Sequence, residues 1–194
     1  EVCQALAEAH ASGIVHRDLK PANIFLAKTP GRDDLVKLLD FGVAKMPDGG
    51  AITKTASVLG SPIYMSPEQL MATRDVDQRS DIWSLGIILY QLLTGEYPFE
   101  GDSLVHLAMV IREKTTPLAR TLRADVPEGL DAIIQKCLQK DRNDRYKDVS
   151  EFADALSDFG SPATSLSVSR IKRIINAKKE RLALASTETK DLFD

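Results

Sequence analysis

Two carboxylates, one lysine and one amide near the start of the chain have the chemistry that phosphoryl transfer requires. Asp18, Lys20 and Asn23 fall within one short segment, HRDLKPAN, and Asp40 begins a second segment, DFG. A carboxylate held in a loop can orient a hydroxyl nucleophile and accept its proton. A lysine can neutralise charge on a migrating phosphoryl group, and amide and carboxylate oxygens are hard ligands for Mg²⁺. The residue types therefore indicate phosphoryl transfer.

Apolar periodicity predicts the elements that position these residues. One face of a helix over residues 1–12 is apolar, and the helix is expected to end before Gly13. Residues 24–26 and 36–39 are short apolar runs typical of strands, and the turn signal TPG at 29–31 lies between them. The first segment therefore lies between a helix and a strand, and the second segment follows the second strand.

The two segments together match a known family pattern. H-R-D-L-x-x-x-N followed by D-F-G is complete at every specified position, so the chain resembles the eukaryotic-like protein kinases, and more narrowly their serine/threonine branch in bacteria. The resemblance covers residues 1–159. It implies an α+β, mainly α-helical, protein-kinase-like fold, of which the sequence contains the C-terminal lobe. The Gly-rich loop, the strand lysine and the helix glutamate of an N-terminal lobe are missing from the sequence.

The resemblance implies a role for each residue that could do chemistry. Asp18 is expected to be the catalytic base, and Lys20 is expected to stabilise the γ-phosphoryl group of ATP during transfer. Lys20 also indicates serine/threonine rather than tyrosine specificity. Asn23 and Asp40 are expected to bind Mg²⁺. Phe25 is expected beneath the adenine ring of ATP, a place that is compatible with ordinary core packing.

Residues 16–23, the HRDLKPAN segment, correspond by the resemblance to the catalytic loop of the kinases. Other residues are expected to support this loop. By the resemblance, His16 packs against Phe41, which points inward; a general-base role for His16 is the less favoured alternative. Asp81 lies in a helix that is apolar on nearly all sides, so it is expected to be buried and to need hydrogen-bond donors. The resemblance implies that these donors are in the backbone of the catalytic loop, and that Glu68 and Arg145 form a buried ion pair.

A polar segment over residues 43–59 resembles the activation loop of the kinases. Thr53 and Thr55 are the expected phosphoacceptors, followed by Ser57. Arg17 is expected to receive the phosphate, because a guanidinium can bind it with two parallel hydrogen bonds. The alternative is a flexible loop with unmodified hydroxyls and an arginine that pairs locally.

Composition excludes several other classes of protein. The net charge of −3 argues against a general nucleic-acid binder, and no apolar run is long enough to span a membrane. Cys3 and Cys137 are expected to be buried, reduced thiols, which suggests a cytoplasmic protein. A membrane anchor beyond Asp194 in a longer protein stays open. His106 has no partner at ligand spacing, so it is assigned no metal.

The break GSP over residues 160–162 predicts a boundary between a kinase lobe at 1–159 and a tail at 160–194. The tail alternates basic and apolar residues, and a linker helix in solvent is favoured over one that binds an acidic partner or a membrane surface. The first residue is not Met and lies within a helical pattern, so we expect a fragment of a longer chain.

These features predict a serine/threonine protein kinase that uses ATP and Mg²⁺ and phosphorylates protein Ser and Thr hydroxyls. Self-association for trans-autophosphorylation is a further expectation. The 194 residues by themselves are expected to have little activity, because they lack the lid over ATP. The alternative is a non-catalytic kinase-like lobe that acts as a binding or scaffold module.

Overall fold

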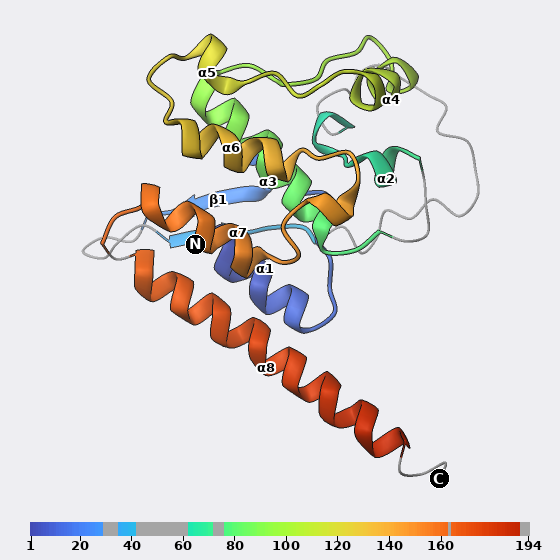
Figure 1. Cartoon of the computed structure of the whole chain (residues 1–194), viewed down its shortest axis with the longest axis vertical. Coiled ribbons are helices and arrows are strands. Elements are labelled where there is room, and N and C mark those ends of the chain that lie inside the picture. The colour runs from blue at the N-terminus through green and yellow to red at the C-terminus, as the bar shows by residue number, and fades with distance from the viewer. Residues whose placement is uncertain (29–34, 42–61, 72–75, 163, 191–194) are drawn as a thin grey trace.

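A computed structural model describes residues 1–28, 35–41, 62–71, 76–162 and 164–190. The described chain is mainly helical, as predicted, with one small sheet (Figure 1). Its elements are α1 (Val2–Ala11), β1 (Ile24–Ala27), β2 (Leu35–Leu38), α2 (Pro67–Leu70), α3 (Arg79–Thr94), α4 (Leu104–Glu113), α5 (Ala119–Leu122), α6 (Glu128–Cys137), α7 (Val149–Leu156) and α8 (Thr164–Lys190).

Helix α3 lies at the centre of the helical layer and is buried along most of its length. Ile82, Trp83 and Ile87 are among its fully buried side chains, and α3 packs against α6. Gly86 allows that close approach, because a Cβ atom there would lie 2.6 Å from the Cβ of Cys137. The helix ends at Gly95, whose φ of 79° is a left-handed conformation that glycine adopts without strain.

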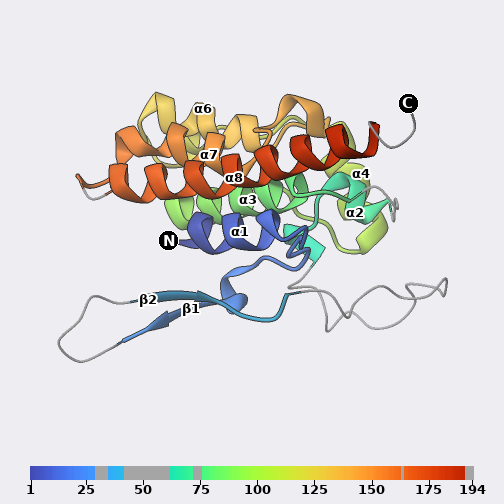
Figure 2. The same ribbon diagram turned by 90° about the horizontal axis from the view of Figure 1, so that it is seen from below.

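Strands β1 and β2 form an antiparallel pair that lies on the α1 side of the helices (Figure 2). Phe25 is opposite Lys37 in the register, and both predicted strands are present. The turn signal predicted between them lies outside the described residues. Phe25 is 54% exposed, and Leu26 and Leu35 are also about half exposed. The sheet therefore presents an apolar surface rather than contributing much to the core.

Both cysteines have free thiols. Cys137 is buried in α6, and Cys3 is half-buried in α1. Burial raises the pKa of the Cys3 thiol to about 11 and also raises the pKa of Cys137. Both thiols are therefore protonated at neutral pH, which makes them poor nucleophiles.

Helix α8 differs from the solvated linker helix that the sequence favoured. It lies against α1 and α7, and Val168, Ile171 and Ile175 are buried in the common hydrophobic core. The part of its apolar face that contains Val168, Ile171 and Ile175 is therefore covered by the rest of the chain. Among the described residues, no helix is both long and apolar enough to cross a membrane.

Candidate active site

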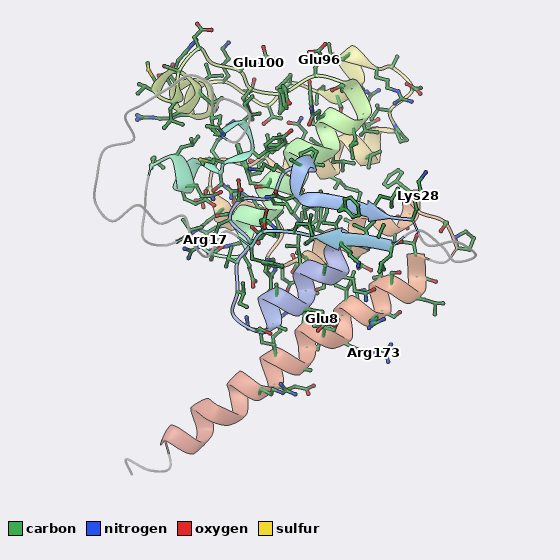
Figure 3. All side chains as sticks on the ribbon, turned by 180° about the vertical axis from the view of Figure 1, so that it is seen from behind. Glu8, Arg17, Lys28, Glu96, Glu100 and Arg173 are labelled. Atoms are coloured by element: carbon green, nitrogen blue, oxygen red, sulfur yellow. The ribbon has the colours of Figure 1, made fainter. Side chains whose placement is uncertain are left out.

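The catalytic loop that follows α1 is held by one buried carboxylate. Asp81, fully buried at the start of α3, accepts hydrogen bonds from the backbone N–H groups of His16 and Arg17, each at 2.9 Å. Figure 3 labels Arg17 on this loop. The structure therefore places Asp81 where the sequence predicted it, against the two residues that precede Asp18.

A third donor to Asp81, His10, was missed from the sequence. Its Nε2 lies 2.7 Å from Asp81 Oδ2, and both side chains are fully buried. A signal was available, because His10 lies four residues after Leu6 on the buried face of α1. A buried histidine needs a polar partner, but the pattern of α1 alone does not say which one.

Both ring nitrogens of His16 have partners. Nε2 donates to the Leu39 carbonyl at 3.1 Å, and Nδ1 accepts from the Asp18 N–H at 3.4 Å. The ring also contacts Phe41, with 4.7 Å between the ring centres. These contacts leave no ring nitrogen available for general-base chemistry and join the catalytic loop to the end of β2. Phe41 is nevertheless 36% exposed, so its ring is less enclosed than the sequence predicted.

Asp18, Lys20 and Asn23 converge in one short loop. The Lys20 ammonium lies 2.9 Å and 3.1 Å from the two Asp18 carboxylate oxygens. A 3₁₀ turn that begins at Pro21 brings Asn23 back toward Asp18, and Asn23 Nδ2 donates to the Asp18 carbonyl at 2.7 Å. The loop thus holds a half-buried carboxylate in a defined orientation beside a cation, as transfer of a phosphoryl group requires.

Asp40 is brought beside Asn23 by the backbone. The Leu39 N–H donates to the Asn23 carbonyl at 2.9 Å, and Asp40 follows directly with an exposed carboxylate. Because Asn23 Nδ2 is engaged with Asp18, the amide oxygen is the atom that can bind a cation. Among the described residues no three His, Cys, Asp or Glu side chains form a complete metal site. The donors fit Mg²⁺, which commonly completes its shell with phosphate oxygens and water.

Two residues of the site have left-handed backbone conformations. Arg17 has a φ of 64° and Asp40 a φ of 51°, and they are the only non-glycine residues with positive φ in the described part of the chain. Such conformations cost about 1–3 kcal/mol each and persist where surrounding contacts hold them. The Asp81 carboxylate provides such a contact at the Arg17 N–H.

The residues Glu68 and Arg145 form a buried, two-pronged ion pair. The two Arg145 Nη atoms lie 2.8 Å and 2.9 Å from the Glu68 oxygens, and Ser80 Oγ donates to Glu68 at 2.6 Å. Burial alone would raise the pKa of Glu68, but the hydrogen bonds and charge of Arg145 outweigh it and lower that pKa. The pair therefore joins α2 to the segment that precedes α7.

Gln69, which the sequence did not indicate, connects α2 with the catalytic loop. Ser66 begins α2 by accepting from the Gln69 N–H, and the Gln69 side chain accepts from the Ser66 N–H in return. Gln69 Nε2 also donates to the Arg17 carbonyl at 2.6 Å. Helix α2 and the loop that contains Asp18 are thus held together by a helix-capping residue.

Lys140 is a half-buried lysine next to the ion pair, and its Nζ atom is enclosed. Its Nζ lies 3.9 Å from the centre of the Phe99 ring and 5.4 Å from that of Trp83. Within the described parts of the chain this Nζ has no hydrogen-bond partner. Burial, assisted by the positive charge of Arg145, lowers the pKa of Lys140 to about 8. Keeping Lys140 charged at neutral pH therefore costs stability.

We expect Lys140→Met to reveal this cost through pH dependence. Between the folded pKa of about 8 and the ordinary value of 10.5, the unfolded chain binds a proton that the folded chain has lost. The free energy of unfolding of the wild type should therefore rise with pH in this window relative to Lys140→Met. We expect a rise of about 1 kcal/mol, because solvent screens a half-exposed side chain.

Urea unfolding of both proteins at about pH 7.5 and about pH 9.5 measures this difference. Lys136→Met is the matched control, since the Lys136 side chain is exposed and lies 4.4 Å from the Tyr146 ring centre. If the difference in free energy of unfolding between the wild type and Lys140→Met is the same at both pH values, the pKa shift at Lys140 is contradicted.

Three predicted features have no structural test. Thr53, Thr55 and Ser57 lie outside the described residues, so the role of Arg17 as their phosphate receptor stays a prediction. Phe25 lies on β1 with its ring largely exposed, and its contact with adenine also stays a prediction.

Comparison with known proteins supplies independent information. Residues 1–157 match the family model described as the protein kinase domain. The chain is 46% identical over 154 residues to the serine/threonine-protein kinase PknB of Mycolicibacterium smegmatis and 43% identical over 157 residues to the serine/threonine-protein kinase Pkn1 of Myxococcus xanthus. It is 40% identical over 157 residues to a probable serine/threonine-protein kinase of Clostridium acetobutylicum.

These alignments cover 78%, 80% and 81% of this chain, respectively. They cover 24%, 22% and 23% of the three relatives. The chain therefore spans less than a quarter of the length of each of these relatives.

Proposed function

Because this chain belongs to the protein kinase domain family, we propose that the protein containing it transfers the γ-phosphoryl group of ATP to Ser and Thr hydroxyls of other proteins. The main support is the Asp18 carboxylate, held within 3.1 Å of the Lys20 ammonium. The loop that holds both is fixed to α3 through Asp81. The names of the relatives support Ser and Thr as acceptors.

In the proposed reaction the substrate hydroxyl attacks the γ-phosphorus of ATP, the bond to the β-phosphate oxygen breaks, and ADP leaves. Asp18 orients the hydroxyl and takes its proton. Lys20 turns from Asp18 toward the γ-phosphoryl group and stabilises its negative charge. Asn23 and Asp40 would hold Mg²⁺, which supplies neutralising charge at the phosphates when bound.

The proposal requires groups that the 194 residues do not contain. No Gly-rich loop with its strand lysine occurs in the sequence, and these groups cover and pair the ATP phosphates in kinases. We therefore expect turnover from the full-length protein with both lobes and little or none from this lobe alone. The exposed apolar surface around Phe25 would form the lower wall of the adenine site.

Regulation and location are part of the same proposal. Phosphorylation of Thr53 or Thr55 by a second copy of the protein would supply an anion for Arg17 and order the activation segment. We propose a cytoplasmic location for the lobe, in keeping with ATP as the proposed phosphoryl donor and with the two free thiols. A non-catalytic scaffold remains the alternative, and it would bind protein partners without transferring phosphate.

The direct test is transfer of labelled phosphate from ATP by the full-length protein. We expect labelled Ser and Thr in an acceptor protein, no labelled Tyr, and no transfer without Mg²⁺. Binding of acceptor proteins without any transfer would instead support the scaffold.

We expect Asp40→Asn in the full-length protein to raise the Mg²⁺ concentration needed for half-maximal turnover. Loss of one charged ligand should raise it about tenfold or more, in line with a coupling energy above about 1.4 kcal/mol. Asp125→Asn is the control, because Asp125 is an exposed carboxylate that pairs with Arg123 away from the loop. Equal Mg²⁺ requirements in the wild type and Asp40→Asn would show that Asp40 is not a metal ligand.

A further inference from the structure

A lysine of helix α8 contacts the last turn of α1. Lys178 Nζ donates to the carbonyl oxygen of His10, which also accepts from the Gly13 N–H at 3.1 Å. The last carbonyls of a helix lack partners within the helix, and a cation at that end also interacts favourably with the helix dipole. Lys178 therefore caps α1 where the chain leaves it for the catalytic loop.

The residue that Lys178 contacts is the one whose ring reaches Asp81. His10 donates through Nε2 to Asp81 Oδ2, and Asp81 accepts from the N–H groups of His16 and Arg17. All of these side-chain contacts are at 2.9 Å or less. A continuous series of polar contacts therefore runs from α8 to the residue immediately before Asp18.

Packing fixes Lys178 in this place. The side chains of Val168, Ile171 and Ile175 are buried against the lobe, and α8 runs beside α1 in Figure 3, where Glu8 of α1 and Arg173 of α8 are labelled. Lys179 binds Asp148 at 3.0 Å, and Asp148 caps the start of α7. Burial alone would raise the pKa of Asp148, but hydrogen bonds from Ser150 and Lys179 lower it. Asp148 is therefore charged at neutral pH.

We propose that Lys178 is a positioning residue for the catalytic loop, so that α8 helps to hold the backbone of that loop in its active arrangement. The proposal concerns a helix that begins beyond the part of the chain matching the kinase domain, which ends at residue 157. Its consequence for turnover rests on the proposed kinase function, whereas its consequence for the loop backbone does not.

Loss of the Lys178 cation would act through α1. The His10 carbonyl would lose a charged donor, and the final turn of α1 would become less restrained. Movement of that turn shifts the His10 ring, which is one of three donors to Asp81. The hydrogen bonds from the His16 and Arg17 N–H groups to Asp81 should then open more often.

Hydrogen exchange on this chain tests the proposal without any assay of activity. We expect Lys178→Met to speed exchange of the His16 and Arg17 amides about fivefold or more, which corresponds to about 1 kcal/mol. Lys178→Arg should restore slow exchange, because the guanidinium keeps both the charge and the donor. Lys172→Met is the matched control, since Lys172 is also on α8 but binds the exposed Asp154 of α7 at 2.7 Å.

Turnover of the full-length protein supplies the second measurement. Lys178→Met should lower kcat about three- to tenfold with KM for ATP unchanged, since the loop carries Asp18 and the ATP site is otherwise intact. Lys178→Arg should recover most of the loss, and Lys172→Met should match the wild type.

Each outcome decides between the proposals. Unchanged exchange at His16 and Arg17 in Lys178→Met overturns the positioning role, as does equal acceleration of exchange throughout the chain, which would show general destabilisation. Faster exchange confined to the loop, with no phosphate transfer even by the wild type, would support the positioning role and reject the kinase function.

Discussion

The substitution Asp18→Asn in the full-length protein is expected to lower kcat for transfer to Ser and Thr by about 100- to 10,000-fold. The amide keeps the shape of the carboxylate but cannot accept a proton at neutral pH. It also removes the negative charge that faces Lys20 at 2.9 Å. The loss should appear in kcat more than in KM for ATP, because Asp18 acts on the hydroxyl nucleophile and not on the nucleotide.

Binding of Mg²⁺ and ATP provides the internal control for Asp18→Asn. The proposed metal ligands Asn23 and Asp40 remain, so the Kd for the nucleotide complex should change less than about twofold. Asp102→Asn is a matched variant, since Asp102 is exposed and pairs only loosely with His106 at 3.6 Å. Turnover that survives in Asp18→Asn would reject Asp18 as the base.

The variant Arg145→Met is expected to lower the free energy of unfolding of this chain by about 3–5 kcal/mol. The Glu68 carboxylate would stay buried and keep the hydrogen bond from the Ser80 hydroxyl, but it would lose both hydrogen bonds from the guanidinium. An uncompensated buried charge is costly because the protein interior screens it poorly. Urea unfolding at neutral pH measures the loss directly.

A double variant separates the cost of the unpaired charge from the value of the pair. Glu68→Gln combined with Arg145→Met should recover part of the stability lost in Arg145→Met alone, because no charge is then left buried. Arg123→Met is the control, since Arg123 is half exposed, pairs with the exposed Asp125 and donates to the Leu93 carbonyl at 3.1 Å. Its loss should lower the free energy of unfolding much less than the loss of Arg145 does. A double variant no more stable than Arg145→Met would contradict this account.

The same pair predicts how stability depends on acid. Because Arg145 lowers the pKa of Glu68 in the folded chain, the contribution of the pair is fully present above 4.5, the ordinary pKa of a glutamate. It is lost as the pH falls through the lower pKa of folded Glu68. The wild-type advantage over Arg145→Met should therefore shrink in that acidic range.

Local patterns were sufficient for the elements that depend on local rules. Helix α3 is apolar on nearly all sides, which predicts its burial, and the structure confirms it. The rule that a buried carboxylate needs donors predicted only that Asp81 is hydrogen-bonded; the resemblance to kinases supplied the catalytic loop as its partner. The burial of α3 required no knowledge of which distant elements meet.

Contacts between distant residues that the family resemblance did not supply could not be predicted. The apolar face of α1 shows that His10 is buried, but its partner Asp81 lies 71 residues away. The basic residues of α8 resemble a solvated surface, because lysine stems can cover apolar surface while their charged ends remain at the edge. Only the packed structure shows that Lys178 reaches the end of α1.

The sequence also did not predict the backbone conformation of Arg17. Arginine has no preference for positive φ, so nothing in the HRD segment predicts the left-handed conformation of Arg17. That conformation is imposed by contacts on both sides of the residue. Asp81 accepts from its N–H and Gln69 donates to its carbonyl.

The contact between Asp81 and the catalytic loop also has a consequence for protein synthesis. The His16 N–H and its acceptor are 65 residues apart, so the ribosome makes the loop well before it makes the carboxylate that holds it. At about 5–20 residues per second this delay is about 3 to 13 s. During this interval the nascent loop lacks the carboxylate that holds its backbone. Folding of the catalytic loop must therefore wait until α3 has been made.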